Sequence, residues 1–200
     1  MSKVTLLTSS RHEDSRGWFS ETYSTSAADA AGIDCVFVQE NHSFSKNAGT
    51  IRGIHFQSPP FAQAKLVRCI RGSIMDYAVD LRRGSPTYGR SISVELNAVN
   101  NRQLFVPVGF GHAFITMVPN TEVIYKVSAP YAPRHDGGIL WSDPNLGIDW
   151  PLPASGPVLS EKDVALPQLE SFMSPFEFEG DALDEVEWNA SLGSAHPTGQ

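Results

Sequence analysis

The sequence predicts an all-β protein, an antiparallel sandwich or barrel of the jelly-roll type with short flanking helices. Most of the chain consists of short segments rich in Val, Ile, Phe and Tyr, separated by turn-forming residues. Apolar and polar residues alternate in places: Ile92, Val94 and Leu96 share one face, and Ser93 and Glu95 share the other. The 200 residues suffice for one domain with a buried core.

The expected strands follow one another along residues 3–128. Turn-forming sequences separate the later ones, at 82–89, 97–101 and 118–121. Short helices are expected near residues 24–32 and after the SEKD stretch at 160–163. The expected strands are KVTLLT (3–8), CVFVQ (35–39), TIRGIHF (50–56), KLVRCI (65–70), SIMDYAVDL (73–81), SISVEL (91–96), RQLFVPV (102–108), HAFITMV (112–118) and EVIYKVS (122–128).

The strand pattern is lost after residue 130. Residues 131–157 are rich in Gly, Pro and Trp, and a long ordered loop of this kind is uncommon unless it serves a site or wraps a partner. We therefore expect a folded domain over residues 1–172 and an acidic tail over 173–200, which its composition predicts to be disordered. The alternative is that residues 176–188, FEFEGDALDEVEW, dock on the domain as an apolar and acidic segment.

The charge distribution argues against a nucleic-acid partner. Of the net charge of −7, residues 171–200 contribute six acidic residues and no Lys or Arg, which leaves 16 acidic against 15 basic residues elsewhere. A nearly neutral domain lacks the basic footprint of a nucleic-acid-binding protein. No apolar run approaches the roughly 18 residues that cross a bilayer, and the N-terminus lacks the apolar core of a secretion signal. We expect a cytoplasmic protein without a membrane partner.

The histidines and cysteines do not have the spacing of a metal site. His55 is not part of an H-x-H pair, and beyond His112 no third histidine in a strand completes the three ligands of a catalytic zinc site. Cys35 and Cys69 are too few for a disulfide framework and are interpreted as buried thiols. We expect no metal and no cofactor.

His55 and Arg52 occupy one strand, but strict alternation places them on opposite faces. The same alternation groups Ile51 with His55. A site that uses both His55 and Arg52 therefore requires a bulge, for which Gly53 is the expected position. Asp76 also lies in a strand, apolar on its other face, and needs a polar pocket or a salt-bridge partner. A lone strand histidine is more often structural than catalytic.

Five stretches carry a more specific signal when they are taken in order. They are DSRGWFSETY, residues 37–89 from FVQENHSF to SPTYG, NNRQLFVPVGFGHAF, EVIYKVSAPYAP and GILWSDPNLGIDWP. Together, from about residue 3 to 168, they resemble the dTDP-4-dehydrorhamnose 3,5-epimerase (RmlC) family. The resemblance implies a cupin-like jelly-roll barrel, a metal-free homodimer and an isomerase acting on a dTDP-4-keto-6-deoxyhexose.

The chemistry of such a substrate explains the residues that the resemblance assigns. A C4 ketone acidifies the protons at C3 and C5, so a base can form an enolate and an acid on the opposite sugar face can return a proton. The resemblance implies His55 as the base, Tyr125 as the acid, Asp163 as the carboxylate that orients the histidine, and Lys65 as the enolate stabiliser. The substrate-binding positions that it implies are Arg16, Phe19, Glu21, Gln39, Asn41, Arg52, Asp76, His112 and Tyr131.

The implied binding positions divide into groups. The first five, from Arg16 to Asn41 in the list, match the nucleotide site, some of whose contacts come from the partner subunit in this family. Arg52 and Tyr131 would hold the diphosphate or flank the sugar. The stretch GFGHAF around His112 replaces the GFAHGF that is common in the family, which bears on the fit of the substrate. Without the family resemblance, Tyr125 is typical of a core tyrosine, and Asp163 is typical of a residue that caps a short helix.

Several functions remain open at this stage. The first is inversion at both C3 and C5, and a close alternative is inversion at C3 only or on another nucleotide-linked 4-keto-sugar. A metal-dependent cupin enzyme and a non-catalytic sugar-nucleotide-binding jelly roll are further alternatives. The missing H-x-H pair argues against the former, and the joint presence of His55, Tyr125 and Asp163 argues against the latter.

Overall fold

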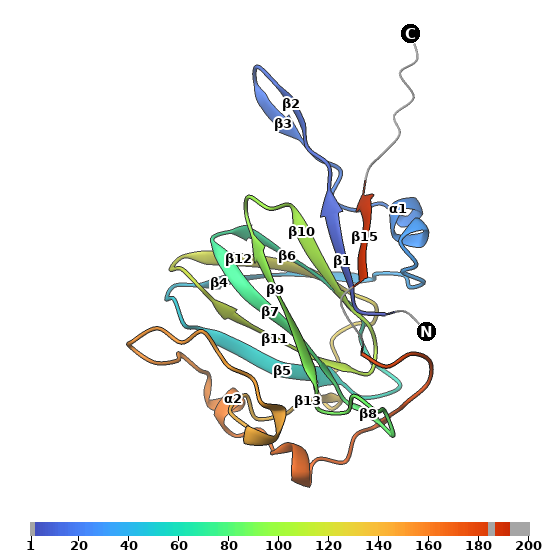
Figure 1. Cartoon of the computed structure of the whole chain (residues 1–200), viewed down its shortest axis with the longest axis vertical. Helices are drawn as coiled ribbons and strands as arrows, with labels where there is room; N and C mark the ends of the chain where they lie inside the picture. Colours follow the sequence, from blue (N-terminus) through green and yellow to red (C-terminus); the bar gives the residue numbers. More distant parts are fainter. Residues whose placement is uncertain (1–2, 184–186, 193–200) are drawn as a thin grey trace.

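Two β-sheets pack face to face and form a jelly-roll barrel (Figure 1). The computed structural model describes residues 3–183 and 187–192 of the chain. The larger sheet has the order β15 (Glu187–Leu192), β1 (Thr5–Ser9), β10 (Arg102–Val106), β6 (Lys65–Arg71), β12 (Thr121–Val127) and β4 (Gln39–Ser45). The smaller sheet has the order β13 (Asp136–Gly138), β5 (Ile51–Gln57), β11 (Phe110–Thr116), β7 (Ser73–Asp80) and β9 (Ser91–Asn97).

Short elements complete the fold. Strands β2 (His12–Asp14) and β3 (Gly17–Phe19) form a hairpin that projects from the barrel (Figure 1). Strands β8 (Arg82–Arg83) and β14 (Phe176–Glu177) pair in parallel. No helix among the described residues is long and apolar enough to span a membrane. The helices are α1 (Thr25–Ala30) and α2 (Glu161–Val164), and the 3-10 turns are η1 (Pro144–Leu146) and η2 (Leu169–Ser171).

The predicted fold class is confirmed, and both short helices lie near their expected positions. One predicted strand is wrong, because the strand expected at 35–39 begins only at Gln39 and continues to Ser45. The preceding Val36 and Val38 are exposed, and only the N–H of Val38 bonds to the neighbouring strand, at the carbonyl of Val127. A run of apolar residues therefore predicted a strand where the backbone lacks a continuous partner.

Apolar side chains from both sheets fill the space between them. Leu104 and Val67, which are paired on neighbouring strands of the larger sheet, meet Leu96 and Phe114 of the smaller one. Fully burying such a side chain stabilises the fold by roughly 1.5–3 kcal/mol. Lys65 shares the inward face of β6 with Val67 but lies where the interior becomes polar, and the candidate site is found there.

The Gly- and Pro-rich loop after residue 130 covers the outer face of the smaller sheet. Ile139 and Trp150 from this loop are buried against Tyr77 and other side chains of that face. The rings of Tyr77 and Trp150 lie 4.5 Å apart, and the indole N–H of Trp150 donates to the carbonyl of Trp141. The loop thus wraps the protein's own sheet, and its continuation leads to α2 at the site.

The expectation of a disordered tail from residue 173 is wrong for the part that the structure describes. Ser174 and Phe176 are buried, and β14 pairs with β8. Strand β15 then pairs in parallel with the edge strand β1 (Figure 1). Composition alone underestimated the order of this segment, because two buried side chains and backbone pairing suffice to hold it. Residues 184–186 and 193–200 of the expected tail lie outside the described residues.

Candidate active site

A bulge in β5 directs Arg52 and His55 to the same side of the sheet. Between the partners of these two residues on β11 there is only Ala113, whereas β5 places Gly53 and Ile54 there. Gly53 has a φ of 135°, and a Cβ at this position would lie 2.3 Å from the Cβ of Ala113. Only glycine fits this position, which confirms the predicted bulge.

The extra residue shifts the alternation of β5, so one expectation from strict alternation is wrong. Ile51 borders the cavity, but its packing partners are Ile54, Phe56 and the other members of the apolar cluster on the outer face of the smaller sheet. The apolar face holds the strand in place, while Arg52 and His55 line a cavity on the other face.

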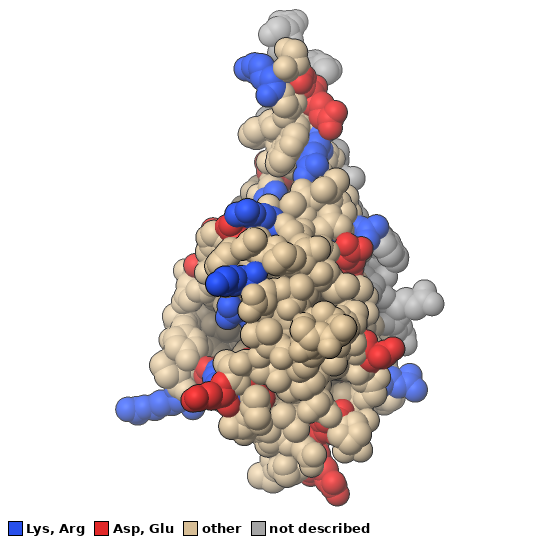
Figure 2. Space-filling view, turned by 90° about the vertical axis from the view of Figure 1, so that its left-hand side faces the viewer, with Lys and Arg blue, Asp and Glu red and all other residues tan. Residues whose placement is uncertain are grey.

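The cavity has a volume of about 460 Å³ and receives side chains from both sheets and from α2. A second hollow of about 400 Å³ adjoins it and shares four of its lining residues, His55, Lys65, Tyr125 and Lys162. Figure 2 shows a hollow on this side of the molecule with Lys and Arg side chains gathered beside it. The first cavity is lined by Ser43, Thr50, Ile51, Arg52, His55, Lys65, His112, Phe114, Tyr125, Val158, Leu159, Ser160, Lys162 and Asp163.

His55 is held by Asp163 at a distance of 2.6 Å between Nε2 and Oδ1. Asp163 is 3% exposed and lies in the first turn of α2, and Ser160 caps that helix. The hydroxyl of Ser160 donates to Oδ2 of Asp163 at 2.8 Å and accepts from its backbone N–H at 3.2 Å. Asp163 therefore does not cap the helix itself. Its carboxylate is aimed at the imidazole.

The electrostatics of the pair favour an ionised Asp163. Burial raises the pKa of its carboxyl, but the hydrogen bonds from His55 and Ser160 outweigh burial and hold that pKa below its ordinary value. An ionised carboxylate only accepts hydrogen bonds, so in the neutral form of the imidazole Nε2 of His55 carries the proton and Nδ1 keeps a lone pair. The imidazole is therefore prepared to accept a proton.

Tyr125 faces this histidine from the other sheet. It lies on β12, lines both hollows and is partly buried. Burial raises the pKa of its phenol, the nearby Arg52 lowers it, and Asp136 raises it further, with a net upward shift. The phenol therefore keeps its proton at neutral pH. The cavity thus carries a histidine from the smaller sheet and a protonated phenol from the larger one.

Lys65 supplies a buried positive charge between them. Its ammonium donates to the backbone carbonyl of His55 at 3.3 Å. Burial lowers the pKa of Lys65 to about 8, although Asp136 and Asp76 partly oppose this effect. The ammonium remains mostly charged at neutral pH and can stabilise a negative charge that forms in the cavity.

Asp76 lies behind His112 and is not on the cavity wall. It is fully buried, and its Oδ1 lies 2.8 Å from Nε2 of His112, which does line the cavity. Burial raises the pKa of Asp76 and lowers that of His112, so both groups are shifted toward their neutral forms. The structure thus places Asp76 where it can hold His112, rather than at a position that contacts a substrate directly.

The other sequence-predicted binding residues fall into two groups. Gln39, Asn41 and Tyr131 line the adjoining hollow, and Gln39 donates to Asn41 at 2.8 Å. Arg16 and Phe19, in contrast, lie on the exposed hairpin of β2 and β3.

Within this chain, the residues on and after the hairpin do not meet the cavity. Arg16 pairs with Asp14 at 2.6 Å, and the carboxylate of Glu21 accepts from Ser24 at 2.9 Å. The structure of one chain therefore does not bring Arg16 or Glu21 to His55.

Sequence reasoning missed two charged residues of the site. Lys162 lines both hollows and pairs with Asp136 at 2.5 Å between Nζ and Oδ2. The hydroxyl of Tyr131 donates to the same oxygen of Asp136 at 3.0 Å. Lys162 directly precedes Asp163 in the sequence, and this adjacency to a predicted site residue could have indicated that Lys162 also lies at the site. Asp136 lies in a region without a strand pattern, and nothing in the sequence indicated that it belongs to the site.

No three His, Cys, Asp or Glu side chains lie close enough together to hold a metal ion within residues 3–183 and 187–192. The carboxylates of the site are instead paired with histidine or lysine side chains. That the protein uses no metal or cofactor stays a prediction.

The chain matches a known protein family. The family model described as dTDP-4-dehydrorhamnose 3,5-epimerase matches residues 1–171. A protein of that name from Sinorhizobium fredii is 46% identical over 178 residues, which cover 89% of this chain and 91% of that protein.

Solved structures of similar proteins contain related ligands. The dTDP-4-dehydrorhamnose 3,5-epimerase from Bacillus anthracis, with TDP and PPi bound, is 48% identical with a TM-score of 0.79, over 82% of this chain and 93% of that one. An RmlC from Legionella pneumophila in complex with dTDP-4-keto-L-rhamnose is 33% identical with a TM-score of 0.82, over 88% and 100%. A 3'-monoepimerase from Streptomyces bikiniensis in complex with dTDP-quinovose is 35% identical with a TM-score of 0.78, over 84% of both chains.

Proposed function

We propose that this chain, which belongs to the dTDP-4-dehydrorhamnose 3,5-epimerase family, inverts C3 and C5 of dTDP-4-keto-6-deoxy-D-glucose to give dTDP-4-keto-L-rhamnose. It is an isomerase. The observation that carries the proposal is the placement of the His55–Asp163 pair on one wall of the cavity and of Tyr125 on the opposite wall. Inversion needs a base and an acid on opposite faces of the sugar ring.

In the proposed reaction, His55 removes the proton from the carbon next to the C4 ketone. Asp163 keeps the imidazole in the tautomer that can accept this proton and stabilises the imidazolium that results. The electrons of the broken C–H bond move into the ketone and give an enolate. Lys65 stabilises the enolate oxygen with its buried ammonium.

Tyr125 then returns a proton to the same carbon from the other side of the ring. Its raised pKa keeps the phenol protonated until this step. The electrons of the enolate take the proton, the ketone re-forms and the centre is inverted. The imidazolium of His55 then releases its proton to solvent and the phenolate of Tyr125 takes one up, and repetition at the second carbon completes the double epimerisation.

We also propose how the nucleotide is held. Arg52 and Lys162 stand at the rim of the cavity and supply positive charge for the diphosphate. The hairpin residues Arg16 and Phe19, together with Glu21, would complete the nucleotide site of a partner subunit in a homodimer. This assignment accounts for their position away from the cavity of their own chain.

A homodimer also accounts for apolar side chains that the single chain leaves in solvent. Monomeric proteins rarely expose such side chains as large contiguous patches. Light scattering would test the dimer: we expect twice the chain mass of 21.8 kDa, and a monomer with full turnover would contradict this assignment. The exposed apolar side chains on the hairpin and around β4 are Trp18, Phe19, Val36, Val38 and Phe44.

The second candidate function is inversion at C3 only. It is supported by the similarity of this chain to a 3'-monoepimerase. Both reactions use the same base and acid. The experiment that separates them is NMR of the product formed from dTDP-4-keto-6-deoxy-D-glucose. We expect the L-rhamno configuration. A product inverted at C3 alone would support the second candidate, and unchanged substrate would overturn both.

A further inference from the structure

Residues 174–183, which we call the strap, lie beyond the region matched by the family model yet are anchored to the barrel. The strap begins at Ser174, whose hydroxyl donates to the carbonyl of Leu81. It continues as β14 along β8, and the N–H of Phe178 then donates to the carbonyl of Arg83 at 3.0 Å. An extended segment with this series of backbone contacts is part of the fold.

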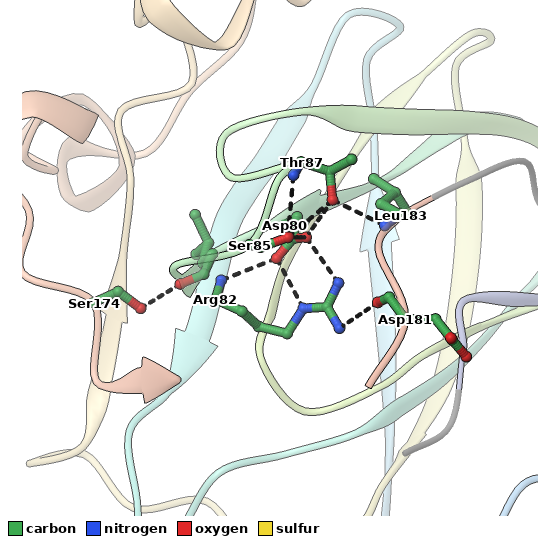
Figure 3. Close-up of polar contacts among 8 residues, drawn as sticks. Asp80, Arg82, Ser85, Thr87, Ser174, Asp181 and Leu183 are labelled. Carbon is green, nitrogen blue, oxygen red and sulfur yellow. Dashed lines mark hydrogen bonds and ion pairs between the residues drawn. The ribbon is translucent and has the colours of Figure 1, made fainter. Parts of the chain in front are cut away.

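A buried polar network fastens the far end of the strap (Figure 3). Asp80 accepts two hydrogen bonds from the guanidinium of Arg82, at 2.9 and 2.8 Å. The remaining terminal nitrogen of Arg82 donates to the carbonyl of Asp181 at 3.0 Å, and the N–H of Leu183 donates to Thr87 at 2.8 Å. Without the strap, a buried guanidinium would lose a partner, which is costly.

The guanidinium of Arg82 also lies against two aromatic rings. Its central carbon is 4.4 Å from the ring centre of Phe110 and 5.0 Å from that of Phe178. Phe178 belongs to the strap, so this contact holds the strap to the loop between β7 and β9. It does not involve β5.

Phe176 makes the contact that connects the strap to the site. Its ring packs edge-on against Phe56 at 5.5 Å, and Phe172 packs against Phe56 at 5.3 Å. Phe176 is 6% exposed and belongs to the apolar cluster behind β5. Phe56 directly follows His55, so the strap supports the strand on the face opposite the cavity.

This support lies next to the bulge in β5. The bulge interrupts the regular pairing of β5 with β11 just before His55. On its other side, β5 pairs with the three-residue strand β13, whose Gly137 and Gly138 offer no side chains for packing, and β5 also exchanges backbone hydrogen bonds with Val158 and Ile139. The side chains that hold Phe56 from behind therefore add the side-chain support that β13 does not give to the strand at His55.

We propose that the strap positions His55 through the contact of Phe176 with Phe56. The proposal rests on the proposed role of His55 as the base. The strap itself touches no substrate, and Phe176 is a positioning residue. A displacement of a base by a fraction of an ångström is enough to slow proton abstraction, because the reaction requires close alignment.

The test compares two phenylalanines of the same strap in the full-length protein. Phe176→Ala removes the contact with Phe56, and Phe178→Ala removes the contact of the Phe178 ring with Arg82, which does not involve β5. We expect Phe176→Ala to lower kcat on the order of ten-fold with little change in KM. Phe178→Ala should lower the thermal midpoint but leave the kcat of the folded protein near that of wild type.

A spectroscopic measurement makes the test independent of turnover. The Nε2 proton of His55, which is bonded to Asp163, is followed by NMR in wild type and in both variants. We expect its signal to shift in Phe176→Ala and to stay in place in Phe178→Ala. If the alanine variant does not fold, Phe176→Leu, which keeps an apolar side chain, replaces it. This variant should show a smaller decrease in kcat and a smaller shift of the His55 signal.

Results that would overturn the role of the strap differ from those that would overturn the proposed function. An unshifted His55 signal, together with a kcat for Phe176→Ala or Phe176→Leu within about two-fold of wild type, would overturn the role of the strap. Equal effects of the Phe176 and Phe178 variants on kcat would do the same. A wild-type protein that does not epimerise the sugar nucleotide would instead overturn the proposed function, and the NMR comparison would still decide the role of the strap.

Discussion

Nε2 of His55 lies 2.6 Å from Oδ1 of Asp163, although 108 positions separate the two residues in the chain. The second oxygen of Asp163 is held by Ser160 at 2.8 Å. A carboxylate that is held at both oxygens keeps one orientation, and so does the imidazole that it binds. The short helix α2 thus delivers a fixed partner to a base on β5.

Ser160→Ala should weaken this arrangement without removing it. We expect kcat to fall by about five-fold, which corresponds to the roughly 1 kcal/mol that one hydrogen bond contributes. Ser160→Thr keeps the hydroxyl and should retain most of the activity. Steady-state kinetics of the two variants make the comparison, and equal activity in both would show that Ser160 does not orient Asp163.

Gly53→Ala should destabilise the protein and reduce its activity. The new Cβ would lie 2.3 Å from that of Ala113, at a backbone φ of 135°. Gly84→Ala is the matched control, because Gly84 also has a positive φ but no atom within 4 Å of its Cβ position. Thermal unfolding should show a clearly larger loss for Gly53→Ala than for Gly84→Ala. Similar losses would mean that the bulge tolerates a side chain.

Tyr125→Phe should separate proton removal from inversion. The base remains, so the substrate should still exchange its C3 and C5 protons with solvent, but without the phenol little inverted product should form. NMR in heavy water follows both processes at once. Normal inversion by the variant would place the acid at another residue.

The activity should decrease in alkaline solution because Lys65 loses its proton. Burial lowers the pKa of Lys65 to about 8, so its ammonium is present below this pH and is lost above it. We expect kcat/KM to fall as the pH rises through about 8. Lys65→Arg, which keeps a charge over this range, should move the decrease to higher pH. A decrease at the same pH in both proteins would assign it to another group.

The sequence predicted most of the barrel because apolar and β-branched residues recur in its strands. Alternation also revealed that Arg52 and His55 share a face only if the strand bulges, and Gly53 marked the place. The face of Ile51 was assigned wrongly for the same reason, since a bulge shifts every residue on one side of it.

Other features left only weak signals in the chain. Asp136 and Lys162 meet only after the loop beyond residue 130 has wrapped the smaller sheet. Acidic residues interrupt the apolar residues of the strap, and Phe176 is buried through a contact with Phe56 that no local periodicity reports. Such contacts depend on tertiary packing rather than on local pattern.

The most direct test of the account is the uptake of deuterium from heavy water into dTDP-4-keto-6-deoxy-D-glucose, read by NMR for wild type and for His55→Ala. We predict label at both C3 and C5 with wild type. With His55→Ala we predict a loss of exchange of about 10²–10⁴-fold, the usual contribution of a general base. Exchange by His55→Ala at more than about a tenth of the wild-type rate would contradict the assignment of His55 as the base.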